Sequence, residues 1–297
     1  MPSKATLSFF VGFGLILAVH CPRSKATPAQ AENQGAGFAG SVKTRNLDAA
    51  FREALQASVQ ALQNDQFEAA QTSARQAVAL AKSMQPQDER LPEAIGQLGT
   101  VYASHLDYKQ AEEAFRQQLD TAERLYGAQH PLVIPALENL AMTALAQTNF
   151  AASETYFDRA VDLNQKTYGE NSTAVAGDLR ALAHIYAAQK DFVKGETTLL
   201  RVVKIYKTLY GPNDSRVAEP LSGLCTLYDN WGIAEKAAAC HARLVPLTEQ
   251  QFGPSSRHLV RELIAEAQAL RRLGRNDEAA VVEQRVESIE SALSNLN

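Results

Sequence analysis

The chain has 297 residues, of which 45% are hydrophobic and 7% aromatic, and its formal net charge at pH 7 is −4. An acidic balance gives no general attraction to nucleic acid or to anionic lipid, so both are excluded as general partners. An alanine-rich composition with few aromatic residues is typical of helices that pack closely on one another.

Residues 1–31 are predicted to be a secretory signal peptide. Lys4 precedes an apolar run from Leu7 to Val19, and Ala29-Gln30-Ala31 provides a small-residue cleavage site before Glu32. The run is too short to span a bilayer comfortably, because a spanning helix needs about 20 residues. The sequence therefore predicts export, into the periplasm of a bacterium, and no membrane span after cleavage.

Two alternatives to cleavage stay open. The positive region holds a single lysine and the cleavage site lies far from the apolar run, so an uncleaved membrane anchor is one alternative. Cys21 allows a lipoprotein, although Ala18-Val19-His20 lacks the leucine and the small residue that such a site has. Cleavage after Ala31 leaves 26 basic against 33 acidic residues, a net charge of −7.

Residues 32–45 are glycine-rich and aperiodic, which predicts a flexible linker. Gly35, Gly37 and Gly40 formally match the dinucleotide-binding pattern G-x-G-x-x-G. That pattern binds a cofactor only between a strand and a helix, and no strand is predicted before it. The sequence predicts no cofactor.

A repeat of 42 residues organises the rest of the chain. Residues suited to capping a helix recur at that step, and a Tyr-Gly or Phe-Gly pair recurs from Tyr126-Gly127 to Phe252-Gly253. The cap positions are Asn46, Asp88, His130, Ser172, Asp214 and Ser256. They divide the chain into units 46–87, 88–129, 130–171, 172–213, 214–255 and 256–297. Such a period predicts an all-α stacked array of helix-turn-helix units.

Each unit is predicted to hold a helix A and a helix B. In the third unit His130 and Pro131 begin helix A, which runs to Gln147, and helix B runs from about Ala151 to Tyr168. Small residues recur where the two helices must approach each other. They are Gly99, Ala141, Ala183, Cys225 and Ala267 on helix A, and Ala111, Ser153, Gly195, Ala237 and Ala279 on helix B.

The order Leu-small-x-x-Tyr in helix A, followed by Ala and Phe or Tyr in helix B, resembles the tetratricopeptide repeat. The Tyr-Gly-x-x-His junction at 126–130 and the length of 42 resemble its kinesin light chain type. The resemblance covers residues 46–297 and implies a right-handed α-solenoid of six repeats. It also implies that helix A lines a concave groove that binds a protein or peptide partner.

Groove positions follow from that resemblance, unit by unit. They are Gln97, Thr100, Glu138, Asn139, Met142, Arg180, His184, Ser222, Thr226, Gln268 and Arg272. The kinesin light chain type often has an asparagine before the Leu-small pair, which holds a peptide backbone. Asn139 keeps it, whereas Ala181 and Gly223 have lost it. We expect Asn139, Arg180 and His184 to form the central contact set.

No catalytic or metal-binding motif is present in the sequence. The histidines are scattered, without H-E-x-x-H or paired Cys/His spacing, and no nucleophile elbow occurs. The sequence therefore predicts a non-catalytic scaffold and no metal. Two alternatives are a structural accessory subunit of an envelope complex and an enzyme acting on envelope polymers. The sequence sets neither the partner nor the oligomeric state.

Cys225 and Cys240 are the cysteines left after signal removal. An exported chain meets oxidising conditions, and the two residues fall on helix A and helix B of the fifth unit, so a disulfide is possible. Two separate buried thiols are the alternative, because a sequence cannot establish the Cα–Cα distance that bridging needs.

Overall fold

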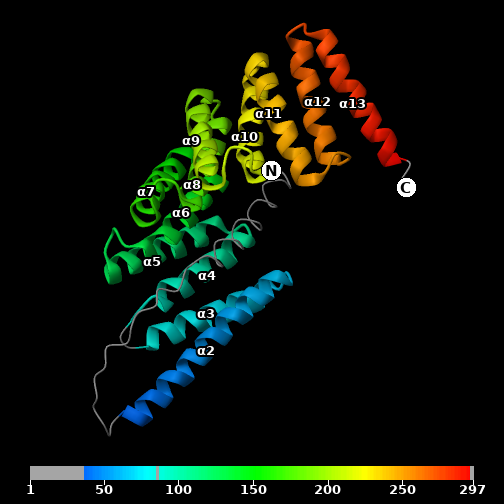
Figure 1. Ribbon diagram of the computed structural model, residues 1–297. Coiled ribbons are helices and arrows are strands. Elements are labelled where there is room, and N and C mark those ends of the chain that lie inside the picture. The colour runs from blue at the N-terminus through cyan, green and yellow to red at the C-terminus, as the bar shows by residue number, and fades with distance from the viewer. Residues whose placement is uncertain (1–36, 85–86, 295–297) are drawn as a thin grey trace. The chain divides into compact units, whose positions relative to one another are not determined.

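The computed structural model describes residues 37–84 and 87–294 (Figure 1). Within these ranges the chain forms twelve α-helices and two short 3-10 helices, and no strand. The signal-peptide prediction and Cys21 lie outside the described residues. The chain divides into two compact units, Met1–Leu163 and Asn164–Asn297, and each is described by itself.

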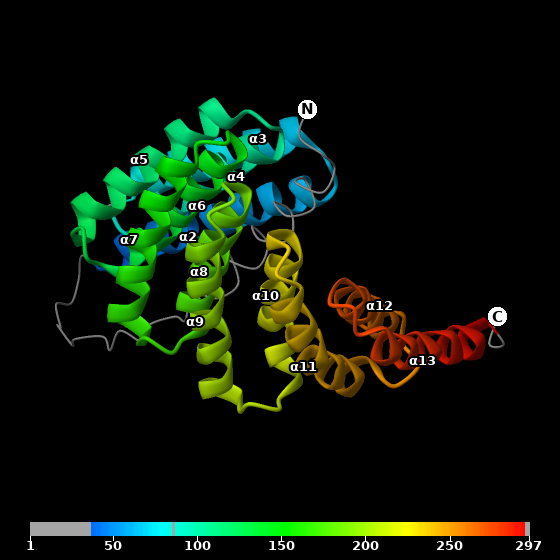
Figure 2. The same ribbon diagram turned by 90° about the horizontal axis from the view of Figure 1, so that it is seen from above.

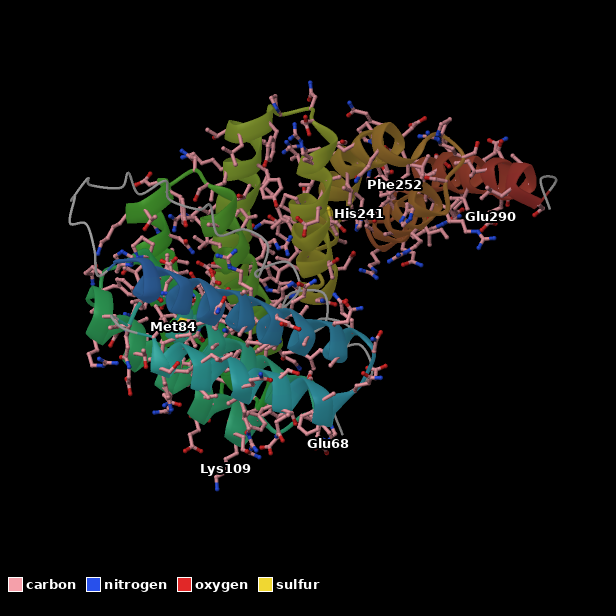
Figure 3. The ribbon with its side chains drawn as sticks, turned by 90° about the horizontal axis from the view of Figure 1, so that it is seen from below. Glu68, Met84, Lys109, His241, Phe252 and Glu290 are labelled. Carbon is pink, nitrogen blue, oxygen red and sulfur yellow. A yellow bond between two sulfur atoms is a disulfide. The ribbon has the colours of Figure 1, made fainter. Side chains whose placement is uncertain are left out.

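The first unit contains the first three helix pairs. They are α2 (Gly37–Gln63) with α3 (Phe67–Ser83), α4 (Arg90–Ser104) with α5 (Tyr108–Tyr126), and η1 (Pro131–Val133) and α6 (Ile134–Ala146) with α7 (Phe150–Tyr168), in which the unit boundary falls. Consecutive helices pack on each other, and α4 also contacts α2 and α6. Side chains such as Met84 lie between helices, whereas Glu68 and Lys109 point outward (Figure 3).

The second unit contains the remaining three pairs. They are α8 (Thr173–Ala188) with α9 (Phe192–Tyr210), η2 (Ser215–Val217) and α10 (Ala218–Trp231) with α11 (Ala234–Phe252), and α12 (Arg257–Arg272) with α13 (Asn276–Ser294). A view from above shows α12 and α13 as neighbours joined by a short turn (Figure 2). The predicted all-α repeat solenoid is confirmed.

Five of the six predicted cap residues accept a backbone N–H at the start of a helical segment. They are Asp88, His130, Ser172, Asp214 and Ser256. His130 does so through Nδ1, 3.2 Å from the Leu132 nitrogen. The caps satisfy donors that have no partner within the helix, so each repeat begins at a defined residue.

Asn46 is the exception, and the prediction of a flexible linker over 32–45 is wrong for Gly37–Arg45. These residues are helical, because α2 begins at Gly37 and Asn46 lies inside it. Extending an existing helix is far easier than nucleating one, so the amphipathic segment that follows carries the helix backward. The glycines weaken this extension by about 1 kcal/mol each without preventing it.

Small residues allow helix A and helix B of one repeat to approach closely, as predicted. A Cβ atom added to Gly99 would lie 2.5 Å from Cε1 of the Phe115 ring, so no larger residue fits. In the third repeat Ser153 is fully buried and donates its hydroxyl to the carbonyl oxygen of Ala141 at 2.7 Å. The small-residue positions therefore set the spacing within each helix pair.

Candidate functional site: a groove in the second unit

The second unit contains a pocket of about 560 Å³, lined by residues of α8, α9, α10, α11 and α12. Four predicted groove residues line it: Arg180 and His184 from α8, and Ser222 and Thr226 from α10. The structure therefore brings together the groove residues of the fourth and fifth repeats.

One face of α10 supplies a polar stripe to this pocket. Ser222, Thr226 and Asn230 follow one another at four-residue intervals and therefore lie on the same side of the helix. Thr226 donates its hydroxyl to the backbone oxygen of Ser222 at 3.0 Å. Among the described residues, no side-chain hydrogen bond is made by Asn230 or by the Ser222 hydroxyl. These groups are available to a ligand.

Charges in the pocket are largely compensated within the protein. Arg180 forms an ion pair with Glu219, and Glu262 contacts His241. His184 is exposed at the edge of the pocket, and desolvation by the atoms around it, and then the Arg180 charge, lower the pKa of its imidazole, which favours the neutral form. The pocket therefore offers hydrogen-bonding groups with little net charge.

Arg261, in the first turns of α12, is a charged pocket residue that is not paired within the described part of the protein. It lines the pocket, is exposed, and makes no ion pair or hydrogen bond with any residue of the described ranges. An unpaired guanidinium offers several donors in a fixed plane, which suits a carbonyl or carboxylate oxygen of a ligand.

The pocket floor is apolar and partly open. Ala183, Leu199 and Leu227 contribute to it, and Gly223 leaves space above Leu199. A Cβ atom added to Gly223 would meet nothing nearer than Cδ2 of Leu199, at 3.4 Å. Gly223 occupies the position that Asn139 has two repeats earlier, so losing the asparagine widens the groove.

Predicted groove residues of the first unit are engaged within the protein. Gln97 donates to the hydroxyl of buried Ser58 at 3.1 Å, and Asn139 donates to Oε1 of Gln118 at 3.3 Å. Thr100 donates to the backbone oxygen of Gly96 at 3.1 Å.

Two further residues predicted for the first unit's groove are buried. Glu138 is 8% exposed and Met142 7% exposed. Little of either side chain is accessible to a ligand. The predicted contact set of Asn139 with Arg180 and His184 is divided between the two units, and only its two α8 members line the pocket described above.

The sixth repeat places its two predicted residues differently. Gln268 lines a smaller hollow of about 340 Å³ formed by α12 and α13. Arg272 lies 3.6 Å from Oδ1 of Asp229, in a weak ion pair. Asn230 and Arg261 were missed by the sequence analysis, although the four-residue spacing from Ser222 and Thr226 was a signal for Asn230.

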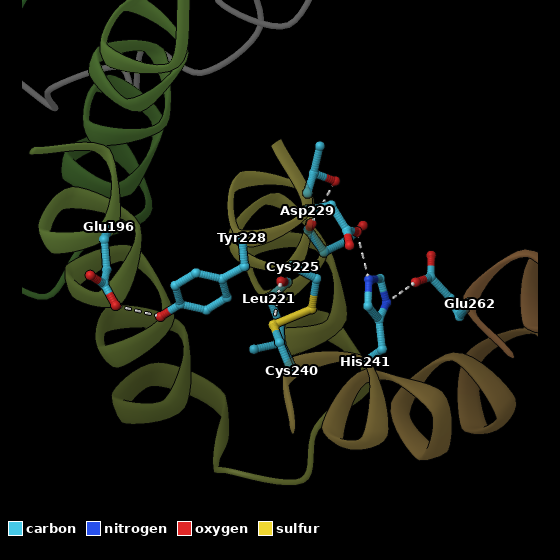
Figure 4. Close-up of a disulfide and its surroundings, with 10 residues drawn as sticks. Glu196, Leu221, Cys225, Tyr228, Asp229, Cys240, His241 and Glu262 are labelled. Carbon is cyan, nitrogen blue, oxygen red and sulfur yellow. Dashed lines mark hydrogen bonds and ion pairs between the residues drawn. A yellow bond between two sulfur atoms is a disulfide. The ribbon is translucent and has the colours of Figure 1, made fainter. Parts of the chain in front are cut away.

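Cys225 and Cys240 are joined in a disulfide, with their Cα atoms 5.4 Å apart (Figure 4). The bond connects α10 to α11 within the fifth repeat, and Cys225 is fully buried. Both helices line the pocket, so the disulfide fixes the spacing of two of its walls.

Neither a membrane-spanning helix nor a metal-binding cluster occurs over residues 37–84 and 87–294. No helix there is both long and apolar enough to cross a bilayer. No group of three or more His, Cys, Asp or Glu side chains there is arranged to hold a metal ion.

Comparison with known proteins identifies the repeats. Residues 90–166, which form α4 to α7, match the family profile described as Tetratricopeptide repeat. The helix pairs of residues 90–166 are tetratricopeptide repeats. No curated protein matches the sequence.

Solved structures share its fold at low identity. BtubC (BKLC) from P. vanneervenii is 20% identical, with a TM-score of 0.60 over 84% of this chain and 92% of that one. A kinesin light chain-like protein of Podosopora anserina with nearly identical TPR-like repeats is 17% identical, with a TM-score of 0.58 over 69% and 97%. PilF of Pseudomonas aeruginosa is 16% identical, with a TM-score of 0.54 over 82% and 93%. These likenesses show the fold of the chain.

Proposed function

We propose that the protein is an exported, non-catalytic scaffold that binds an extended segment of a partner protein in the groove of the second unit. The tetratricopeptide repeat fold generally serves protein–protein interaction. One observation carries the proposal: Ser222, Asn230 and Arg261, whose side-chain polar groups have no partner among the described residues, line one pocket together with apolar side chains. An extended peptide presents N–H and C=O groups along its backbone, which such a stripe pairs, and side chains that an apolar floor accommodates.

The compensated charges of this groove favour a backbone over a highly charged ligand. Because Arg180 is paired with Glu219, it adds little net field to the groove. Desolvation and the Arg180 charge lower the pKa of His184, so this residue adds little positive charge to the groove. We infer that Arg261 supplies the single charged contact.

Affinity capture with two matched double variants tests this proposal. Residues 32–297 serve as bait for an extract of the native host, and captured proteins are identified and their binding to purified bait measured. Asn230→Ala with Arg261→Ala is expected to weaken binding at least tenfold, because both groups line the pocket and neither has an internal partner. Asn213→Ala with Arg243→Ala removes the same residue types from exposed positions outside the pocket and should leave binding unchanged.

If the variant Asn230→Ala, Arg261→Ala still captures the partner, the interface lies outside this pocket. The outer side of α9 is then the next place to test, because Val193 and Leu200 are 64% and 48% exposed and lie two helical turns apart. That outcome would favour an accessory structural role over groove binding.

The export step has its own test. It rests on Lys4, the Leu7–Val19 run and Ala29-Gln30-Ala31. N-terminal sequencing of the protein from its native host should give Glu32 as the first residue. An intact Met1 in the soluble cytoplasmic fraction would exclude export and leave the groove proposal standing.

A further inference from the structure

A buried histidine joins the fifth repeat to the sixth. His241, on α11, is 4% exposed, and each of its ring nitrogens faces a carboxylate (Figure 4). Nε2 lies 2.9 Å from Oδ2 of Asp229 on α10, and Nδ1 lies 3.1 Å from Oε2 of Glu262 on α12. One imidazole therefore bridges three helices.

Two hydrogen bonds at the His241 ring need one proton more than a neutral imidazole and two ionised carboxylates supply. A neutral imidazole has a single N–H, and an ionised carboxylate has none, so they make one of the two hydrogen bonds. The second bond needs another proton, on the ring or on a carboxyl group. Loss of that proton leaves a ring lone pair against a carboxylate oxygen, about 3 Å away.

The helices packed around His241 each place charged side chains near its ring. Besides Asp229 and Glu262, Glu266 of α12 lies near enough to interact with His241. Of the nearby cations, Arg272 of α12 forms a weak ion pair with Asp229, one of the two carboxylates at the ring, and Arg285 of α13 donates to Glu249 of α11 at 2.7 Å. The environment of the ring is acidic, which favours the protonated form.

The balance of these effects sets the direction of the titration. Burial alone would lower the pKa of His241, but the hydrogen bonds that the protonated ring donates to Glu262 and Asp229, and the charges of these carboxylates, outweigh it and raise the pKa above 6.5. A raised pKa in the folded state means that stabilisation is fully present below the unfolded value and is lost as pH rises through the folded value.

We propose that His241 is a pH-sensitive tie between the fifth and sixth repeats, which releases Glu262 and loosens α12 when it loses its proton. Glu262 and Arg261 are adjacent on α12 and both line the pocket, so the release changes one wall of the groove. This last step rests on the proposed groove function; the tie itself does not.

Hydrogen exchange of the full mature chain, without ligand, tests the tie. With rates corrected for intrinsic pH dependence, amide protection in α12 and α13 should fall as pH rises above about 6.5, through the raised pKa of His241. In His241→Gln the protection of α12 should be low throughout and independent of pH. His258→Gln is the matched control, because His258 also lies on α12 but stacks on Phe252, with ring centroids 4.1 Å apart. It should keep the wild-type response.

A wild-type response that persists in His241→Gln, or protection of α12 that does not change with pH in the wild type, would overturn the proposal. If His241→Gln does not fold, Glu262→Gln provides a second test. Removing one carboxylate should shift the midpoint of the His241 imidazole titration, followed by NMR, to lower pH; an unchanged midpoint contradicts the tie. Neither readout uses a partner, so failure here leaves the groove proposal intact, and failed capture leaves the tie intact.

Discussion

The two units share the same 42-residue repeat and use the polar side chains at the predicted groove positions differently. In the first unit Gln97 donates to Ser58 and Asn139 donates to Gln118. These amide groups therefore hydrogen-bond neighbouring helices to each other. In the second unit the stripe of α10 has free donors and acceptors above an open pocket. The repeat thus sets the positions of side chains, and their local partners decide whether a position stabilises the array or is open to a ligand.

Stabilisation also differs between the units. Large side chains such as Phe115 and Leu140 fill the space beside Gly99 in the first unit. The second unit has a disulfide and a buried His241 junction in addition to its hydrophobic cluster. Variants placed in each unit test this contrast.

Leu140→Ala should have the largest effect, because Leu140 is 1% exposed and packs against Tyr102, Ala111 and Phe115. The cavity should lower the free energy of unfolding by about 2–5 kcal/mol, measured by denaturant titration. Asn46→Ala is the control. Asn46 lies exposed within α2, where alanine is the better helix former, so we expect a change of less than about 1 kcal/mol. Equal shifts in both variants would contradict the repeat account.

Loss of the Cys225–Cys240 disulfide should affect the second unit next most strongly. The bond closes a loop between residues 15 apart, which constrains the unfolded chain by about 3 kcal/mol at most. The double variant Cys225→Ala, Cys240→Ala should therefore unfold at lower denaturant concentration. Mass spectrometry of the native protein, alkylated without reduction, checks the premise. Two alkylated thiols would exclude the bridge and favour two buried cysteines.

Gly99→Ala and Gly223→Ala compare the packing of the two units directly. Alanine in place of glycine in a helix stabilises by about 1 kcal/mol when space allows. At Gly223 the added methyl meets Leu199 at 3.4 Å, so a modest gain is expected. At Gly99 it meets the Phe115 ring at 2.5 Å, and overpacking should destabilise by about 1–3 kcal/mol. The same sign of change in both thermal unfolding midpoints would remove the contrast.

Much of the fold could be predicted from the sequence because the repeat makes local signals reinforce one another. Caps such as Ser172 and small residues such as Ser153 recur in register, and the structure gives them the expected contacts. Asn46 was misjudged because a cap residue is recognised by type, whereas its use depends on whether the helix continues past it.

The site was less predictable for a physical reason. Whether Asn139 is available depends on Gln118, which lies on a helix of the preceding repeat. The His241 contacts join residues 12 and 21 positions apart on three helices, with no motif to mark them. Partner choice across helices depends on side-chain geometry, which periodicity does not specify. Export and groove binding stay predictions.

The smallest expected difference comes from removing one groove residue in each unit. Asn139→Ala should cost about 1 kcal/mol, because it leaves Oε1 of Gln118, a residue 6% exposed, without its donor. Ser222→Ala should stay within about 0.5 kcal/mol, since its hydroxyl has no partner among the described residues. A double-mutant cycle with Gln118→Ala separates the hydrogen bond from other effects: once Gln118 is removed, the cost of Asn139→Ala should largely disappear. An undiminished cost would mean that Asn139 stabilises the array in another way, and that its amide is open to a ligand after all.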